Sequence, residues 1–209
     1  MEPVILNHPL IKHKLTIMRD KTTGTKEFRE LISEVSMMLL YESLKDIKLV
    51  EKEIETPLKK MTGYVIDENK MAFIPILRAG TGMLDGLMKV IPNAKIGHIG
   101  LYRNEETLKP VKYYYKVPKD ISKRIIYVLD PMLATGGSAI DAVKILKNHG
   151  AKKITFICII AAPEGVKAFC EANPDIPLYI GVIDRELNEK AYICPGLGDC
   201  GDRIFGTVK

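Results

Sequence analysis

A short turn near the middle of the chain carries the residue types that bind phosphate. It begins with Asp130 and continues through Ala134-Thr135-Gly136-Gly137-Ser138. Glycine leaves backbone N–H groups accessible to a ligand, and the two hydroxyl groups add further hydrogen-bond donors. Glycine and threonine are also common in ordinary connections between a strand and a helix. We favour an anion-binding loop because an acid precedes the turn and hydroxyl residues flank the Gly-Gly pair.

The residues on either side of this turn predict a strand before it and a helix after it. Ile125–Leu129 is a short apolar run, typical of a strand buried on both faces, and Pro131 cannot extend the ladder of that strand. Residues 139–146 are apolar at helical spacing. This order directs free N–H groups and the positive end of the helix toward one point, where a phosphate fits. The turn contains neither Gly-Lys-Ser/Thr nor Gly-x-Gly-x-x-Gly, which excludes a Walker loop and a dinucleotide fingerprint.

Two further loops place arginines after predicted strands. Arg78 follows the apolar run 72–77 and precedes two glycines, and Arg103 follows the run 96–101. Taken alone, Arg78 is also explained as a residue at a helix start, and Arg103 as a solvated charge. Because ligands bind at the carboxyl ends of parallel strands, we expect both arginines near the phosphate loop, where they suit a pyrophosphate.

Strand and helix patterns alternate over residues 71–183, which predicts an α/β fold with a mostly parallel sheet flanked by helices. We expect a single domain over 1–209, with N-terminal helices and a peripheral hairpin in 1–70 and a separate C-terminal segment in 184–209. Residues 102–116 are charged, rich in tyrosine and without core periodicity, so we expect a mobile arm there. The predicted elements are helices over 10–18, 28–42, 83–88, 139–146 and 163–172, a hairpin over 50–66, and strands over 72–77, 96–101, 125–129, 154–161 and 178–183.

Composition and charge exclude several classes of protein. The chain has 209 residues, 46% of them hydrophobic and 27% charged, as in an ordinary globular enzyme. The formal net charge is +5, but the lysines form no long run, so we expect anionic substrates and no nucleic acid partner. The four cysteines form no Cys-x-x-Cys pair, so a zinc site is not expected. No signal-peptide pattern or membrane-length apolar stretch occurs, so we expect a cytoplasmic protein without a membrane partner.

Motifs along the whole chain resemble those of known phosphoribosyltransferases. Residues 130–138 resemble the loop with which type I phosphoribosyltransferases hold phosphoribosyl pyrophosphate (PRPP). Residues 192–207 closely resemble the base-binding hood of the uracil phosphoribosyltransferases. Further segments that carry this resemblance are 8–10, 28–31, 75–80 and 97–103.

This resemblance implies a fold, a reaction and a set of ligands. The fold is that of a type I phosphoribosyltransferase with a base-binding hood in 184–209. The reaction converts uracil and PRPP to UMP and pyrophosphate in pyrimidine salvage, through a transition state with oxocarbenium character. Mg²⁺ is expected to bind together with PRPP rather than directly to the protein, with Asp130 reaching it through water. GTP activates some members of the family, and the exposed-looking N-terminal helices favour a homodimer or higher homo-oligomer.

The resemblance also assigns roles to individual residues. Backbone N–H groups of residues 134–138, with two hydroxyls, are expected to hold the 5′-phosphate, and Asp130 to contact ribose hydroxyls. The residues expected to bind PRPP are Arg78, Arg103, Asp130, Pro131, Met132, Leu133, Ala134, Thr135, Gly136, Gly137, Ser138 and Asp199. Those expected to bind uracil are Ile193, Gly198, Asp199 and Cys200. Those expected to act in catalysis are Arg103, Asp130 and Asp199, with the arm 102–116 closing over the site as a lid.

The sequence departs from the family pattern at two positions. Asp130-Pro131 stands where many phosphoribosyltransferases have two adjacent acids, and Cys200 stands where a small residue is expected. We expect the Cys200 thiol at the pocket edge, open to a bulky thiol reagent. Two alternative functions stay open. One is a PRPP- or UMP-sensing, RNA-binding regulator that would use the tyrosines of 113–115, and the other is a phosphoribosyltransferase for another base.

Overall fold

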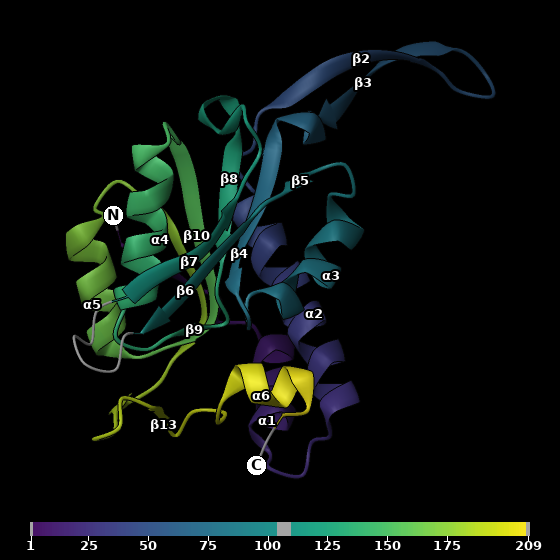
Figure 1. Ribbon diagram of the computed structural model, residues 1–209. Coiled ribbons are helices and arrows are strands. Elements are labelled where there is room, and N and C mark those ends of the chain that lie inside the picture. Colours follow the sequence, from purple (N-terminus) through teal and green to yellow (C-terminus); the bar gives the residue numbers. More distant parts are fainter. Residues whose placement is uncertain (1, 104–109, 208–209) are drawn as a thin grey trace.

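A mostly parallel sheet forms the centre of the molecule. The computed structural model describes residues 2–103 and 110–207, with only the backbone of Arg103 and Pro110 (Figure 1). The sheet order is β1-β11-β10-β8-β4-β6-β7, with β5 beside β4 and β9 beside β10. The strands are β1 (Val4–Ile5), β4 (Met71–Leu77), β5 (Lys95–Ile96), β6 (His98–Arg103), β7 (Pro110–Lys116), β8 (Ile125–Leu129), β9 (Met132–Leu133), β10 (Lys153–Ala161) and β11 (Leu178–Ile183). Their pairings are parallel except for β6 with β7, which confirms the predicted α/β fold.

Helices cover both faces of the sheet because its central strands are apolar on both sides. Within β4, Phe73 faces one layer of helices and Ile74 faces the other, and both side chains are fully buried. The first layer consists of α1 (Pro9–Arg19), α2 (Thr25–Ser43) and α3 (Thr81–Val90), and the second of α4 (Gly137–Asn148) and α5 (Pro163–Ala172). Two short 3₁₀ helices, η1 (Glu68–Lys70) and η2 (Ile121–Lys123), lead into β4 and β8. No helix within the described ranges is long and apolar enough to cross a membrane.

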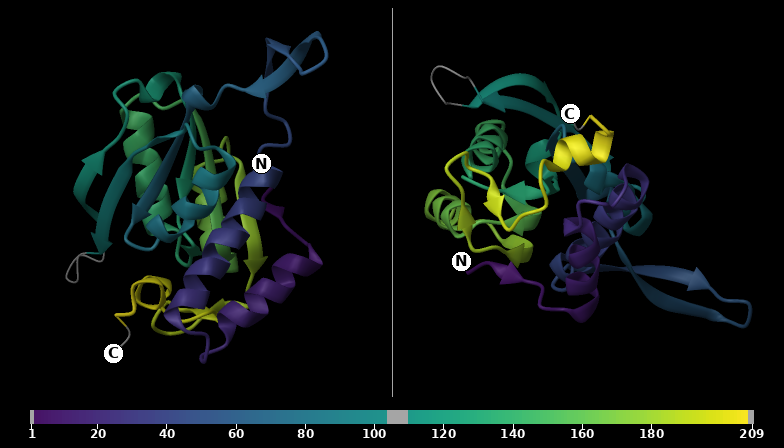
Figure 2. Two further views of the ribbon diagram at one scale, coloured as in Figure 1. Left: turned by 90° about the vertical axis from the view of Figure 1, so that its right-hand side faces the viewer. Right: turned by 90° about the horizontal axis from the view of Figure 1, so that it is seen from below.

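The predicted peripheral hairpin is formed by β2 (Leu49–Glu55) and β3 (Lys60–Ile66), and it projects from the body of the molecule (Figure 2). Val50 lies opposite Val65, and Ile54 opposite Met61. These four side chains share one face of the hairpin, and none of them is buried. Such an apolar face is unfavourable in water unless another surface covers it.

The structure adds several short elements to those that the sequence predicts, and two regions of the chain matter for the site. Strand β7 occupies residues 110–116 of the predicted arm and pairs with β6, while residues 104–109 lie outside the described residues. The mobility of this arm therefore stays a prediction. In the glycine-rich C-terminal segment, a short helix α6 (Cys200–Phe205) follows a separate antiparallel pair of strands, β12 (Glu186–Leu187) and β13 (Ile193–Cys194).

Candidate active site

A pocket of about 320 Å³ lies at the carboxyl ends of the central strands, where α6 and the loop before β13 close it. We call residues 184–207 the hood, and Figure 2 shows them from below, beneath the sheet and beside α1 and α2. The pocket brings together the loops after β4 and β8 and the hood, as the sequence predicts. Its lining residues are Arg78, Ala79, Met132, Ala134, Ala191, Tyr192, Asp199, Cys200 and Gly201.

The phosphate loop is held in shape by close backbone contacts. Gly136, the N-cap of α4, has a φ of 85°, a conformation that favours glycine. At Gly165, the third residue of α5, an added Cβ would lie 2.2 Å from the carbonyl oxygen of Ala134, so no other residue fits there without a shift. The side chains of Thr135 and Ser138 are exposed, and neither hydroxyl bonds to another described residue. The loop therefore offers free hydroxyls and the free N–H groups of the first turn of α4 at one place.

Two of the residues expected to bind PRPP, Pro131 and Leu133, lie behind the residues that line the pocket. Pro131 is buried, and its carbonyl accepts hydrogen bonds from the backbone N–H groups of Ile159 and Ile160, each at 3.0 Å. Leu133 is buried as well, and its carbonyl accepts from Ala162 at 3.0 Å. These bonds fasten the loop to the end of β10 and its C-terminal flank, so Pro131 and Leu133 shape the loop rather than line the pocket.

Asp130 follows β8 directly and is half-buried. Burial raises the pKa of its carboxyl to about 7, although the N–H of Met132 donates to Oδ1 at 3.3 Å and acts in the opposite direction. A nearby cation would favour the ionised form, which can accept hydrogen bonds from ligand hydroxyls.

The charged residues in and beside the pocket are compatible with a divalent cation that binds together with a phosphate ligand. Among the described residues, no group of three or more His, Cys, Asp and Glu side chains is placed to hold a metal. Asp130 is not part of the pocket lining but lies two residues before Met132, which is; Oδ2 of its carboxylate has no hydrogen-bond partner within the described part of the chain. Mg²⁺ is commonly bound by one or two carboxylates together with the phosphates of a substrate. A Mg²⁺ ion held through PRPP is therefore compatible with this site.

Arg78 stands between the phosphate loop and the hood. At Gly80 an added Cβ would lie 2.4 Å from the carbonyl oxygen of Leu129, so the loop after β4 touches the end of β8. The Arg78 guanidinium is exposed, with Nη2 3.4 Å from Asp202 Oδ1 and Cζ 5.7 Å from the centre of the Phe205 ring. The sequence pattern assigns no role to Asp202 or Phe205, although Asp202 is the second acid of the glycine-rich segment. The Arg103 side chain lies outside the described residues, although its backbone ends β6.

In the hood, the predicted base-binding residues differ in their placement. Asp199 and Cys200 line the pocket, while Ile193 and Gly198 lie beside it. Asp199 is the N-cap of α6, and its Oδ1 accepts a hydrogen bond from the N–H of Asp202 at 2.8 Å. The Ile193 side chain is buried, so only its backbone is available to a ligand. Tyr192 is half-exposed at the pocket rim and was absent from the predicted set.

Cys200 corrects the expectation of an accessible thiol. The residue borders the pocket, as expected, but it is only 2% exposed, so its thiol is not open to a bulky reagent. Burial raises the pKa of this thiol well above its ordinary value, and the nearby carboxylates of Asp130 and Asp199 act in the same direction. Because the thiolate is the reactive form, the cysteine should be inert in the folded protein.

The raised pKa of Asp130 predicts a pH-dependent cost in stability. Between the ordinary value of 3.8 and about 7, the folded protein keeps a proton that the unfolded chain releases, so stability falls as the pH rises through this range. Asp130→Asn removes this titration. We therefore expect the difference in melting temperature, variant minus wild type, to be larger at pH 8 than at pH 5. At this chain length each kcal/mol of unfolding free energy corresponds to about 2–4 °C. Scanning calorimetry without ligands measures the melting temperatures, and a difference that does not change with pH would contradict the raised pKa.

Burial also predicts which cysteines a thiol reagent reaches. Cys158 and Cys200 are buried, whereas Cys170 and Cys194 are partly exposed. In the native protein we expect slow labelling by iodoacetamide at the two buried positions, and labelling of all four thiols in urea. Peptide mapping by mass spectrometry distinguishes the sites. Prompt labelling of Cys200 in the native protein would show that α6 opens or that the thiol is accessible.

Comparisons with known proteins agree with this geometry. The family model described as uracil phosphoribosyltransferase matches residues 4–207. A protein of Geobacillus sp. strain WCH70 named uracil phosphoribosyltransferase is 59% identical over 97% of both chains. The solved structure of the AQ2163 protein from Aquifex aeolicus is 43% identical, covers 98% of both chains and superimposes with a TM-score of 0.93. A hypoxanthine-guanine phosphoribosyltransferase from Bacillus anthracis, 17% identical with a TM-score of 0.53 over 77% of this chain and 80% of its own, shares the fold alone. The chain belongs to the uracil phosphoribosyltransferase family.

Proposed function

We propose that this protein transfers the phosphoribosyl group of PRPP to uracil and releases UMP and pyrophosphate, as a step of pyrimidine salvage. The observation that carries the proposal is the placement of one pocket between a phosphate loop with free hydroxyls and a hood that presents backbone groups. The family of the chain supports the choice of uracil. All four cysteines are free thiols, in keeping with a reducing cytoplasm as the place of this reaction.

On the PRPP side, the phosphate loop and the two arginines each bind a different part of the ligand. Thr135, Ser138 and the free N–H groups of α4 hold the 5′-phosphate, and ionised Asp130 accepts hydrogen bonds from the ribose hydroxyls. Arg78 and Arg103 hold the pyrophosphate and stabilise its charge as the anomeric C–O bond breaks. Mg²⁺, when bound with PRPP, supplies further positive charge to the departing pyrophosphate. The 102–116 arm excludes water, which would otherwise hydrolyse PRPP.

On the base side, backbone groups around Ile193, Gly198 and Cys200 recognise uracil. Uracil presents an N–H donor flanked by two carbonyl acceptors, a pattern that peptide groups complement without a side chain. Asp199 keeps α6 in place as its N-cap and lies next to the PRPP side of the pocket. The uracil nitrogen is thereby held against the anomeric carbon that the pyrophosphate leaves.

A panel of bases tests the substrate. With Mg²⁺ and PRPP, we expect pyrophosphate release with uracil, and a kcat/KM for cytosine lower by about 10⁴-fold, because cytosine leaves buried polar groups unpaired. Adenine, guanine and hypoxanthine test a phosphoribosyltransferase for another base, and addition of GTP tests activation. Comparable kcat/KM values for cytosine and uracil would overturn this interpretation of the hood. Salt-dependent RNA binding with no turnover of any base would favour the regulator instead.

Asp130→Asn tests the role of the carboxylate. We expect turnover to fall by about 10²-fold or more, because an amide accepts ribose hydroxyls less strongly than a carboxylate does. The variant should stay folded, with the melting behaviour predicted above. Steady-state kinetics at pH 8 measure the effect. Near-normal turnover would remove Asp130 from the mechanism.

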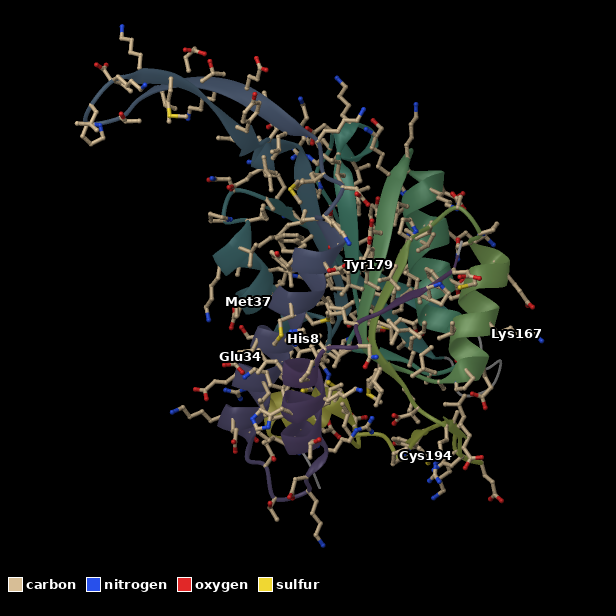
Figure 3. The ribbon with its side chains drawn as sticks, turned by 180° about the vertical axis from the view of Figure 1, so that it is seen from behind. His8, Glu34, Met37, Lys167, Tyr179 and Cys194 are labelled. Atoms are coloured by element: carbon tan, nitrogen blue, oxygen red, sulfur yellow. The ribbon has the colours of Figure 1, made fainter. Side chains whose placement is uncertain are left out.

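We also propose that the protein is a homo-oligomer, held through the apolar face of its hairpin. A groove of about 450 Å³ between β1, α1 and α2 is lined largely by apolar residues, among them Val4, Leu10 and Tyr41, whose side chain is 76% exposed. Figure 3 shows this side of the molecule, with His8 labelled at the groove. The hairpin face and this groove are two exposed apolar surfaces on one chain, and a second copy of the chain would remove both from water.

Adjacent residues on opposite faces of the hairpin test this assembly. Ile54→Lys places a charge on the apolar face, whereas Glu53→Lys places the same residue on the other face. We expect sedimentation to show weaker association for Ile54→Lys and the wild-type oligomer for Glu53→Lys. A wild-type monomer at micromolar concentration, or equal behaviour of the two variants, would contradict the proposed interface.

A further inference from the structure

An ion pair between α1 and the hood holds both backbone groups of one hood residue. Arg19, the last residue of α1, donates from Nη1 to Asp184 Oδ2 at 2.8 Å and from Nη2 to Asp184 Oδ1. The same Nη1 donates to the carbonyl oxygen of Gly196 at 2.8 Å. Asp184 Oδ2 in turn accepts from the N–H of Gly196 at 2.7 Å. The pair therefore fixes the peptide groups on both sides of the Gly196 Cα.

Gly196 is tightly coupled to a backbone group proposed to contact the base. Its φ is 66°, and an added Cβ would lie 2.0 Å from the carbonyl oxygen of Ile193. The turn between Ile193 and Gly196 is thus closed so tightly that a shift of Gly196 must move the Ile193 carbonyl. A second arginine holds the next carbonyl group of the hood: Arg203 Nη1 donates a hydrogen bond to the carbonyl oxygen of Leu197 at 2.8 Å.

The burial and geometry of the ion pair indicate that it orients the hood backbone rather than adding to the stability of the fold. The Asp184 side chain is 4% exposed and that of Arg19 24%, so both charges give up most of their hydration. A buried ion pair of this kind often stabilises a fold no better than apolar residues of similar size would. A bidentate arginine–carboxylate pair does, however, fix direction, because the guanidinium is planar and its donors have a set geometry.

We propose that Arg19 and Asp184 are positioning residues for uracil, acting through Gly196 on the carbonyl of Ile193. The inference rests on the proposed function, in which the hood backbone recognises the base. It assigns to the first helix of the chain, far in sequence from the hood, a part in base selection. Neither residue lines the pocket, so neither is expected to touch uracil or PRPP.

Arg19→Met tests the inference, with Lys14→Met as a matched control. Lys14 lies on the same helix, and Lys14→Met removes a single, more exposed ion pair, that of Nζ with Glu34 Oε2 at 2.6 Å, which lies outside the hood. For Arg19→Met we expect the KM for uracil to rise by about 10-fold or more and the preference for uracil over cytosine to fall, because small misplacements of this kind cost up to about 10²-fold. The KM for PRPP should stay within about 2-fold, and Lys14→Met should leave all three quantities unchanged.

Conservative variants keep the test decisive if Arg19→Met does not fold. Arg19→Lys keeps the positive charge but loses the two-pronged guanidinium geometry, so its KM for uracil should lie between those of the wild type and Arg19→Met. Asp184→Asn should raise the uracil KM in the same way, and its effect should not add to that of Arg19→Lys in the double variant. Calorimetric binding of Mg²⁺-PRPP to each variant shows whether the rest of the site is intact.

The outcomes separate this inference from the proposed function. If the wild-type protein makes no UMP, both the proposed function and this inference are overturned. A wild type active on uracil, with folded Arg19 and Asp184 variants that keep its uracil KM and base preference, would overturn the inference alone. Equal rises in the KM values for uracil and PRPP would also overturn it, because they would indicate general loosening of the site.

Discussion

The ion pair between Arg19 and Asp184 is the interaction on which the geometry of the hood depends. The hood buries few apolar residues, so side-chain packing alone does not fix the positions of its backbone groups. Arginines from within and outside it replace that packing. Arg19 holds Gly196, Arg29 donates to the carbonyl of Ile204, and Arg203 reaches carbonyls of both the hood and the α1–α2 connection. The N-terminal helices thereby act as the support against which the hood is set.

The other half of the site is built on a different principle. There the parallel sheet brings strand ends together, and glycines let the loops approach more closely than any side chain would permit. Gly80 meets the end of β8, and Gly165 meets the phosphate loop. The phosphate side therefore needs little charge pairing of its own, which leaves Thr135, Ser138 and the N–H groups of α4 free for a ligand.

The sequence predicts the parts of this structure that depend on local pattern. The bounds of β8 and β11 follow from apolar runs that end at an aspartate, and those of α5 from Pro163 at its start and Asn173-Pro174 after its end. The phosphate loop follows from its residue types. Helix α6 has only six residues and begins at Cys200, so it has no periodicity to detect, and its N-cap is found only when Asp199 is seen to bond Asp202. The contacts of Arg19 join residues 165 and more positions apart, which one sequence cannot reveal. The contacts of Arg103 with a ligand stay a prediction.

The two ion pairs around the pocket differ in a way that suits their proposed tasks. Arg19–Asp184 is largely buried and joined by two hydrogen bonds, so breaking it would leave a charge that is mostly shielded from water and has lost its ionic partner, at a cost of about 3–5 kcal/mol. Arg78–Asp202 joins a side chain that is 60% exposed to one that is 35% exposed, at 3.4 Å, and such a pair contributes about 1 kcal/mol or less. An anion entering the pocket can therefore take Arg78 from Asp202 at little cost, while the hood, which is proposed to hold the base, keeps its shape. The same pairing of an arginine with an aspartate thus yields a fixed support in one place and a releasable arginine in the other, because the two pairs differ in burial and in hydrogen-bond geometry.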